Sequence, residues 1–205
     1  IGKGVCFDTG GLNLKLGSGM NLMKKDMGGA ANCIGLSRML IKQKIEINLR
    51  LLLPIVENSL SSKAFRPSDI IKSRSGIFVE IGDTDAEGRL ILADALSYAS
   101  ETKTDLIIDM ATLTGASRVA LGTDVPSFFS NKKEISRKLI EFSEITGDPL
   151  WELPLWKNYE GQLESHHADI KNIGNSSFGG AITAALFLQK FVNSGIPWIH
   201  INLMA

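Results

Sequence analysis

The strongest chemical signal in the sequence is the run DTDAEGR at residues 83–89, in which three carboxylates stand at alternate positions before a glycine and a cation. Alternate side chains of an extended segment point in the same direction, so Asp85 and Glu87 can converge on one point. Negative charge concentrated in this way is costly unless a metal ion or cationic side chains neutralise it. The run therefore predicts a cation-binding site.

A second group of charged residues lies near the start of the chain. Asp8 follows the apolar run IGKGVCF and precedes a glycine pair, which places it at the end of a predicted strand, where ligands of α/β sheets gather. Asp26 stands at the start of a predicted helix, where its favourable position on the helix dipole would alone explain a carboxylate. Lys3 lies in the middle of the apolar run, so its amine must find a carboxylate or bind a metal ion in its neutral form.

The two groups together offer four carboxylates and one amine as ligands, namely Lys3, Asp8, Asp26, Asp85 and Glu87. Four carboxylates carry more charge than one divalent ion requires, and two ions that share bridging carboxylates fit this set better. Such a pair would lower the pKa of a bridging water and polarise a carbonyl group. The ligand set suits Mn²⁺, Zn²⁺, Mg²⁺ or Co²⁺ without choosing among them.

A calcium-binding loop competes with this interpretation. Residues 83–94 match the spacing of an EF-hand, with oxygen ligands at Asp83, Asp85, Glu87 and Asp94 and a glycine at Gly88. An EF-hand needs a helix before the loop, whereas GIFVEI is rich in strand-forming residues. Residues 90–98 also have the pattern of an uninterrupted helix, so we favour the two-metal site.

The elements that would position these residues alternate between strands and helices. Apolar runs predict buried strands, and apolar residues at helical spacing predict the helices between them. Repeated strand–helix units predict an α/β fold with a mixed, largely parallel sheet flanked by helices on both faces. The predicted strands cover residues 1–7, 47–56, 76–82, 105–110 and 197–204, and the predicted helices cover residues 26–43, 88–98, 134–146 and 180–193.

The composition is that of an ordinary globular chain, with 205 residues, 44% hydrophobic and 21% charged. Lysine plus arginine and aspartate plus glutamate number 22 each, so the formal net charge is zero. Nothing in that balance attracts nucleic acid or an anionic membrane. No apolar run is long enough to predict a membrane span. Only two cysteines occur, Cys6 and Cys33, which indicates a reducing compartment, and we expect a cytoplasmic location.

Five segments resemble, in order and spacing, the successive signatures of the leucyl aminopeptidase family. They are KGVCFDTGGLNLK, MKKDMGGAA, DTDAEGRLILADAL, ATLTGA and FGGAITAALFL. The resemblance implies a hydrolase, specifically a metal-dependent aminopeptidase that releases N-terminal, leucine-like residues from peptides by means of a water activated by two metal ions. It also implies a cytosolic protease that assembles as a hexamer.

The resemblance further implies a role for each matching residue. The exchangeable metal ion would be held by Asp8, Asp85 and Glu87, and the tighter one by Lys3, Asp8, Asp26 and Glu87. Lys15 would stabilise the oxyanion of the tetrahedral intermediate, a task that suits a preorganised cation. Arg89 would bind a bicarbonate ion that acts as general base. The residues implied to contact substrate are Met23, Thr112 and Gly115, which would form the pocket for the N-terminal side chain, and Leu113, through its backbone.

The chain departs from the family pattern in two ways that bear on function. Asp83 stands where the family motif begins with asparagine, and Asn202 replaces an aspartate that is common in the final strand. The extra charge at Asp83 could strengthen cation binding or misplace the substrate. Family members are also more than twice as long, so we expect residues 1–205 to be a partial catalytic domain that lacks the N-terminal domain and both ends of the catalytic domain.

Two functions from other classes stay open. The chain could be a catalytically inactive, truncated remnant that retains the fold as an assembly or binding element. It could also bind DNA, as some members of the family do in addition to their peptidase activity, but the neutral composition gives this no support and we expect no nucleic-acid partner.

Overall fold

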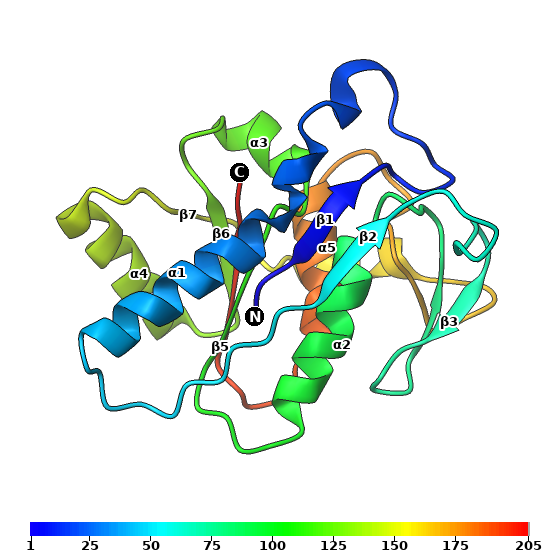
Figure 1. The fold of residues 1–205 in the computed structure, drawn as a ribbon. Helices are drawn as coiled ribbons and strands as arrows, with labels where there is room; N and C mark the ends of the chain where they lie inside the picture. Colours follow the sequence, from blue (N-terminus) through cyan, green and yellow to red (C-terminus); the bar gives the residue numbers. More distant parts are fainter. Residues whose placement is uncertain (205) are drawn as a thin grey trace.

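The computed structural model describes residues 1–204, in which most neighbouring strands run parallel (Figure 1). Six strands form two neighbouring sheets. They are β1 (Gly4–Asp8) and β2 (Ile55–Asn58) in one, and β5 (Ile107–Ala111), β6 (Ser127–Ser130), β7 (Trp151–Glu152) and β9 (Trp198–Asn202) in the other. The pairs β1–β2, β5–β9 and β6–β7 are parallel, and β6–β9 is antiparallel. A parallel bridge between Gly2 and Met110 joins the start of the chain to β5, so β1 and β5 lie side by side.

A smaller sheet lies beside this group of strands (Figure 1). It consists of β3 (Ile70–Lys72), β4 (Phe78–Glu80) and β8 (Ile170–Lys171), with β4 in the centre, antiparallel to β3 and parallel to β8. The chain leaves β4 through a turn that contains Asp83, Asp85 and Glu87 and then enters a helix. The small sheet therefore positions one side of the acidic motif.

Helices lie between the strands along the chain. The α-helices are α1 (Gly28–Lys42), α2 (Gly88–Ser100), α3 (Gly115–Leu121), α4 (Lys133–Thr146) and α5 (Gly180–Gln189), and short 3-10 helices cover Gly17–Met20, Met23–Met27 and Lys157–Leu163. None of the helices within residues 1–204 is both long and apolar enough to cross a membrane.

Successive side chains of β5 point to opposite faces of the sheet, and each face is covered by helices. Ile107 and Ala111 belong to the main core cluster, which also contains buried residues of α2 and α5. Ile108 and Met110 pack in a second cluster with residues of α4. This alternation is the period of a strand buried on both sides. The predicted α/β fold with helices on both faces is confirmed.

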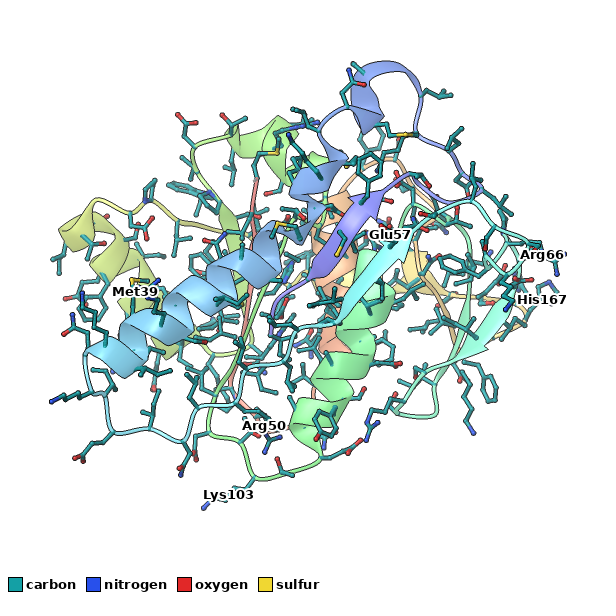
Figure 2. The ribbon with its side chains drawn as sticks, viewed as in Figure 1. Met39, Arg50, Glu57, Arg66, Lys103 and His167 are labelled. Carbon is teal, nitrogen blue, oxygen red and sulfur yellow. The ribbon has the colours of Figure 1, made fainter. Side chains whose placement is uncertain are left out.

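Most predicted elements are present at the predicted places, but the strand at residues 47–56 is wrong for most of its length. Only Ile55–Asn58 pair as β2, and residues 45–54 are irregular. Ile47 and Leu49 are exposed, and Figure 2 shows Arg50 at the periphery of the molecule. An apolar run indicates that a segment prefers burial but does not supply a neighbouring strand. Within residues 1–204 the contacts of this segment with the start of the chain are confined to its end, where Gly2 and Gly4 donate to the carbonyl oxygens of Leu52 and Pro54.

Candidate active site

The end of β1 places Asp8 at the centre of the site. Asp8 is buried, and the turn that follows it passes through Gly10 and Gly11, both of which have positive φ angles (89° and 64°). Glycine adopts this conformation without the penalty that a side chain would add. The turn directs the backbone N–H of Gly10 to Oδ1 of Asp8 at 2.9 Å, which fixes the carboxylate.

Asp26 comes to the same place from the 3-10 helix that precedes α1. A Cβ atom at Gly29 would clash with the backbone of Met110, so this glycine lets α1 approach β5 closely. The close approach brings Asp26 beside Thr112, whose hydroxyl donates to Oδ1 of Asp26 at 2.7 Å. Thr112 was predicted to line the substrate pocket, and its hydroxyl group also holds the carboxylate of Asp26 through this hydrogen bond.

The acidic turn between β4 and α2 is held by Asn172, a fully buried residue after β8. The side-chain oxygen of Asn172 accepts the backbone N–H groups of Gly82 (2.7 Å) and Asp83 (3.2 Å), and its amide donates to the carbonyl oxygen of Asp83 at 2.7 Å. Oδ1 of Asp83 accepts the N–H of Asp85 at 2.8 Å. Asn172 was not identified from the sequence, because its partners lie about 90 residues away along the chain.

Three carboxylates converge at the centre of the site. Oxygen atoms of Asp8, Asp26 and Glu87 lie within 4.8 Å of one another, and all three residues are buried. Nζ of Lys3 lies 2.8 Å from Oδ2 of Asp26 and 3.1 Å from Oε1 of Glu87, and it donates to the carbonyl oxygen of Thr112 at 3.0 Å. Lys3 thus satisfies the first of its two predicted alternatives, an ion pair with carboxylates.

The electrostatics of the cluster reflect its burial. Burial opposes the charge of Lys3, but attraction to Glu87 and Asp26 outweighs burial and raises the pKa of Lys3. Burial raises the pKa of Glu87 to about 7; Lys3 acts against this rise, and the charges of Asp8 and Asp26 add to it. Asp26 and Glu87 therefore share the single ammonium group of Lys3, which leaves excess negative charge for a cation to neutralise.

Lys15 bridges the two halves of the acidic set. Its Nζ lies 2.8 Å from Oδ2 of Asp8 and 2.5 Å from Oδ1 of Asp85. Burial alone would lower the pKa of Lys15, but its hydrogen bonds to these two carboxylates raise it. Burial raises the pKa of Asp85 to about 6, although the hydrogen bond from Lys15 acts against the rise. Lys15 is consequently a charged group held beside the cluster.

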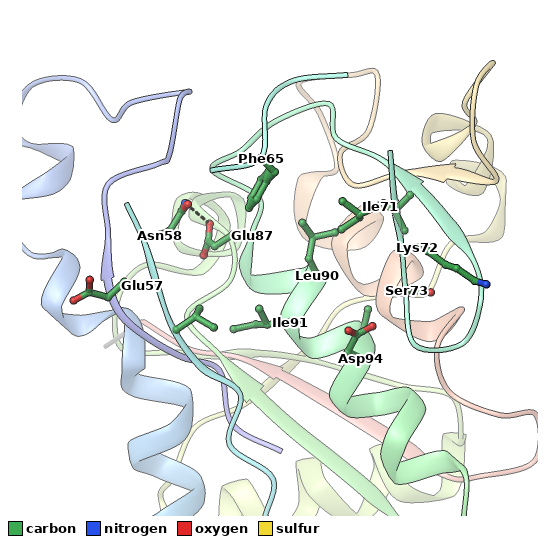
Figure 3. A pocket seen from close by; sticks show the side chains of 13 residues that line it. Glu57, Asn58, Phe65, Ile71, Lys72, Ser73, Glu87, Leu90, Ile91 and Asp94 are labelled. Carbon is green, nitrogen blue, oxygen red and sulfur yellow. Dashed lines mark hydrogen bonds between the residues drawn. The ribbon is translucent and has the colours of Figure 1, made fainter. Parts of the chain in front are cut away.

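Asn58, at the end of β2, is a further site residue that the sequence did not reveal. Its side-chain amide donates to Asp8 Oδ1 (2.9 Å), to the carbonyl oxygen of Thr84 (3.1 Å) and to Glu87 Oε2 (3.3 Å). The dashed line in Figure 3 marks the bond from Asn58 to Glu87. In the sequence Asn58 is only a polar residue just after a predicted strand. Its role could not be predicted because its partners lie far away along the chain.

Arg89 lies in the first turn of α2 and is buried. One guanidinium nitrogen donates to the carbonyl oxygen of Asn172 at 2.8 Å, whereas the buried Nε has no hydrogen-bond partner among residues 1–204. Burial lowers the pKa of Arg89 to about 10, which still leaves the group charged at neutral pH. A buried cation with an unused donor can hold a small anion.

A cavity of about 400 Å³ opens beside the cluster. Most of the predicted site residues line it, namely Lys3, Asp8, Lys15, Met23, Asp26, Asp85, Thr112, Leu113 and Gly115. Lys25 and Arg118, which the sequence did not single out as site residues, line it as well. Glu87 and Arg89 do not line this cavity, but Glu87 forms an ion pair with Lys3, which does line it. The size is within the range of small-ligand sites.

A second cavity of about 300 Å³ adjoins the other side of Glu87 (Figure 3). In Figure 3 Asn58 and Glu87 point toward each other, and Phe65, Ile71 and Leu90 are among the other residues that line this cavity. Its lining is mostly apolar, and none of the predicted site residues apart from Glu87 contributes to it. The first cavity, where the carboxylates, lysines and predicted pocket residues meet, is therefore the candidate active site.

The residues of the cluster fit divalent metal ions. Oδ2 of Asp26 and Oε1 of Glu87 are buried and accept no hydrogen bond in the described part of the chain, although both lie near Lys3. Lys3 supplies one positive charge to these two oxygens, and a divalent cation would offset the negative charge that remains. Oxygen ligands with one amine suit Mg²⁺, Mn²⁺, Co²⁺ and Zn²⁺.

Buried carboxylates and lysines that gather beside a cavity of this size in an α/β domain are typical of an enzyme active site. Comparison with known proteins gives the class. Residues 1–205 match the family model described as the cytosol aminopeptidase family, catalytic domain. The chain therefore belongs to the cytosol aminopeptidase family, whose members are hydrolases, and the predicted resemblance is confirmed.

Curated relatives and solved structures agree with this assignment. Probable cytosol aminopeptidases from Sulfurihydrogenibium sp. and from Syntrophotalea carbinolica are 48% and 49% identical over 203 residues. The crystal structure of cytosol aminopeptidase from Coxiella burnetii superposes with a TM-score of 0.97 at 52% identity, and the bottromycin maturation enzyme BotP in complex with Mn with 0.94 at 39%.

The matches extend over nearly the whole of this chain but over less than half of each relative. The two curated relatives are covered over 40% of their lengths, with 99% of this chain aligned. Both solved structures are covered over 45% of their chains, with all of this chain aligned.

Proposed function

We propose that these residues carry the active site of a metal-dependent aminopeptidase that removes N-terminal, leucine-like residues from peptides. The observation that carries the proposal is the convergence of the buried carboxylates, Lys3 and Lys15 on one cavity that Met23, Thr112 and Gly115 also line. The relatives' printed names, cytosol aminopeptidase, support the activity and a cytoplasmic location. We further propose that residues 1–205 are part of a longer catalytic chain that assembles as a hexamer.

Two divalent ions would be held by the side chains of Lys3, Asp8, Asp26, Asp85 and Glu87, with Mn²⁺ supported by the Mn complex of BotP. Lys3 would need to lose its proton in order to act as a ligand, which makes its binding of metal dependent on pH. When bound, such ions supply the Lewis acidity that polarises a scissile carbonyl and activates water.

Lys15 is suited to stabilise negative charge that develops on the substrate. An ammonium group has three hydrogen-bond donors, and Asp8 and Asp85 accept two of those of Lys15. One donor remains for the oxygen of a tetrahedral intermediate at the wall of the cavity. Because the two carboxylates already fix the ammonium group, little reorganisation is needed during the reaction.

Arg89 would hold a bicarbonate ion, whose chemistry is that of a general base. The unused Nε of Arg89 supports this assignment, since it is a buried donor of a charged group. Met23, Thr112 and Gly115 would surround the side chain of the N-terminal residue, and the backbone of Leu113 would contact the peptide.

The test is hydrolysis of a leucine anilide by the protein at its natural full length, with added Mn²⁺. We expect turnover that is lost in chelator-treated protein and in a Glu87→Gln variant, and restored by Mn²⁺ in the former only. Glu141→Gln, on the exposed side of α4, is the matched control and should behave as the unmodified protein. Folded, metal-loaded protein without turnover would contradict the proposal and leave the inactive assembly element as the explanation.

A further inference from the structure

Two cations of the main cavity have no carboxylate partner. Among residues 1–204 no carboxylate oxygen lies within 4.0 Å of the charged nitrogens of Lys25 or Arg118. The other two cations that line the cavity, Lys3 and Lys15, each form ion pairs with two acidic residues. The cavity therefore has an acidic part, in which two lysines pair with carboxylates, and a cationic part formed by Lys25 and Arg118.

The cationic part coincides with the pocket proposed for the N-terminal side chain. Arg118 follows Gly115 by three positions in α3, so the two residues share one face of the helix. Lys25 lies in the same 3-10 helix as Met23. One guanidinium nitrogen of Arg118 lies 3.8 Å from Sδ of Met204, another residue of the cavity wall. The charges of Lys25 and Arg118 and the apolar atoms of Met23 and Met204 thus line one space.

We propose that Lys25 and Arg118 bind the carboxylate of an acidic N-terminal residue, so that the enzyme accepts glutamyl as well as leucine-like peptides. The inference rests on the proposed aminopeptidase function and extends its substrate class. A glutamyl side chain has an apolar stem and a carboxylate at its end, which match the apolar wall and the two cations. Arginine is well suited to carboxylate recognition because its guanidinium group can donate two parallel hydrogen bonds.

The expected size of the effect follows from exposure. Lys25 is half-buried and Arg118 is exposed, so solvent screens both charges. Exposed ion pairs contribute little, and we expect each cation to favour the glutamyl substrate by about fivefold. The two cations together should favour it by more than tenfold where their effects add.

The experiment compares kcat/KM for the α-anilides of glutamic acid and leucine in the natural full-length protein with Mn²⁺. The ratio of glutamyl to leucyl kcat/KM should fall about fivefold in Arg118→Met and in Lys25→Met. Lys24→Met is the matched control, because Lys24 is exposed in the same 3-10 helix and does not line the cavity. Its ratio should be unchanged. Arg118→Glu should lower the ratio further and raise the relative activity on a lysyl anilide.

Several outcomes would overturn the inference. They are the absence of glutamyl hydrolysis by a protein that cleaves leucyl anilide, an unchanged ratio in both variants, and an equal loss on both substrates. A dipeptide offers a second carboxylate at its C-terminus. Comparison of Leu-Gly with Leu-Gly amide tests whether the two cations bind that group instead. If the variants alter only that pair, the cations bind the terminal carboxylate of a dipeptide and the assignment to the N-terminal side chain is wrong.

A binding measurement separates this inference from the proposed function. Absence of leucyl turnover by the natural protein would contradict the aminopeptidase activity but would leave the cationic pocket testable. Calorimetric titration with free glutamate and free leucine then reports the pocket directly. Tighter binding of glutamate that is lost in Arg118→Met would support the inference, and equal binding in the two proteins would overturn it.

Discussion

Gly88 lies directly against the side chain of Lys3. A Cβ atom added at Gly88 would be 2.6 Å from Nζ and 2.5 Å from Cε of Lys3, closer than nonbonded atoms can approach. Gly88 is the first residue of α2 and follows Glu87, which is one of the ion-pair partners of Lys3. The glycine thus leaves the space that the ammonium group needs between the acidic turn and β1.

Gly88→Ala is therefore expected to displace Lys3 and to weaken metal binding at least tenfold, since one proposed ligand would leave its place. Calorimetric titration with Mn²⁺ would measure the loss. Gly35→Ala is the matched control, because a Cβ atom there meets nothing within 4 Å and Gly35 is exposed in the middle of α1. It should bind Mn²⁺ normally and stabilise α1 by about 0.5–1 kcal/mol. Equal Mn²⁺ affinities in both variants would contradict the role of Gly88.

Removal of metal should lower the stability of the protein, because the charges of Asp8 and Asp26 add to the repulsion on Glu87. A ligand that binds only the folded state at 100 times its Kd stabilises it by about 2.7 kcal/mol. For a domain of this size that corresponds to a rise in Tm of roughly 5–10 °C. Differential scanning calorimetry with and without Mn²⁺ would show the shift.

The same thermal measurement has a direct control. Asp26→Asn should shrink the Mn²⁺-dependent shift, whereas Glu141→Gln on the exposed side of α4 should retain it. A shift of equal size in Asp26→Asn would mean that Mn²⁺ binds elsewhere.

The sequence singled out these residues because their types and spacing carry chemistry. Asp8 and Asp26 stand at a strand end and a helix start, positions that the sequence pattern identifies. The expectation that Asp85 and Glu87 lie on an extended segment is wrong, because both lie in or beside a turn, and only Glu87 joins Asp8 and Asp26 within 4.8 Å. Lys3 was conspicuous because a lysine inside an apolar strand needs a partner. The structure brings Lys3, Asp8, Asp26 and Glu87 together and joins Asp85 to Asp8 through Lys15, and metal binding by these residues stays a prediction.

The residues that support this group could not be predicted in the same way. Asn58 and Asn172 are polar residues in unremarkable stretches, and their hydrogen bonds reach partners that are 50 and about 90 residues away. Only the folded chain shows that they hold the carboxylates and the acidic turn. The departure at Asp83 also becomes clear only in the structure. Its Oδ1 accepts the N–H of Asp85, a bond that an asparagine oxygen could accept equally well.

Burial was the least predictable property, as residues 45–54 show. Their apolar content predicted a strand covered on both faces, but residues 45–51 are exposed and only Leu52 packs against the main core cluster. The helix α3 was missed for a different reason. It is only seven residues long, which is too short to give a clear helical period.

Glu80 should make the stability of the protein depend on pH. The hydrogen bond from Ser165 lowers the pKa of Glu80, burial acts against this, and Lys171, 3.2 Å from its carboxylate, lowers it further. A carboxyl group with a depressed pKa in the folded state stabilises the protein above its ordinary pKa and loses that contribution as the pH falls through the folded-state value. Glu80→Gln should therefore reduce the free energy of unfolding by about 1 kcal/mol at pH 7, after allowance for solvent screening.

Urea unfolding at a series of pH values would check the sign. The difference between Glu80→Gln and the unmodified protein should shrink toward zero as the pH falls below the ordinary range of glutamate. A difference that stays constant with pH would show that the charge of Glu80 contributes nothing and that only the change in packing matters.

Asn202 should control substrate affinity because it holds the backbone beside the cavity. Its Oδ1 accepts the N–H groups of Leu113 (3.2 Å) and Thr114 (3.3 Å), and its amide donates to the hydroxyl oxygen of Thr114 at 2.6 Å. Asn202→Asp retains the acceptor and lets the hydroxyl of Thr114 donate instead, so we expect kcat/KM for a leucine anilide to change less than about threefold. Asn202→Leu leaves two donors unsatisfied, which costs about 1–3 kcal/mol for each buried group.

The effect of Asn202→Leu should be a rise in KM of about tenfold with a smaller change in kcat, since the loop that carries Leu113 would loosen while the acidic cluster stays in place. Asn131→Leu separates this from a general loss of stability. Asn131 makes the same type of bonds at the other end of β9, where it accepts from the N–H of Trp198 and donates to Ile196, each at 2.8 Å. The Asn131→Leu variant should destabilise the protein without raising KM. An equal rise in KM in Asn131→Leu and Asn202→Leu would show that Asn202 acts through stability alone.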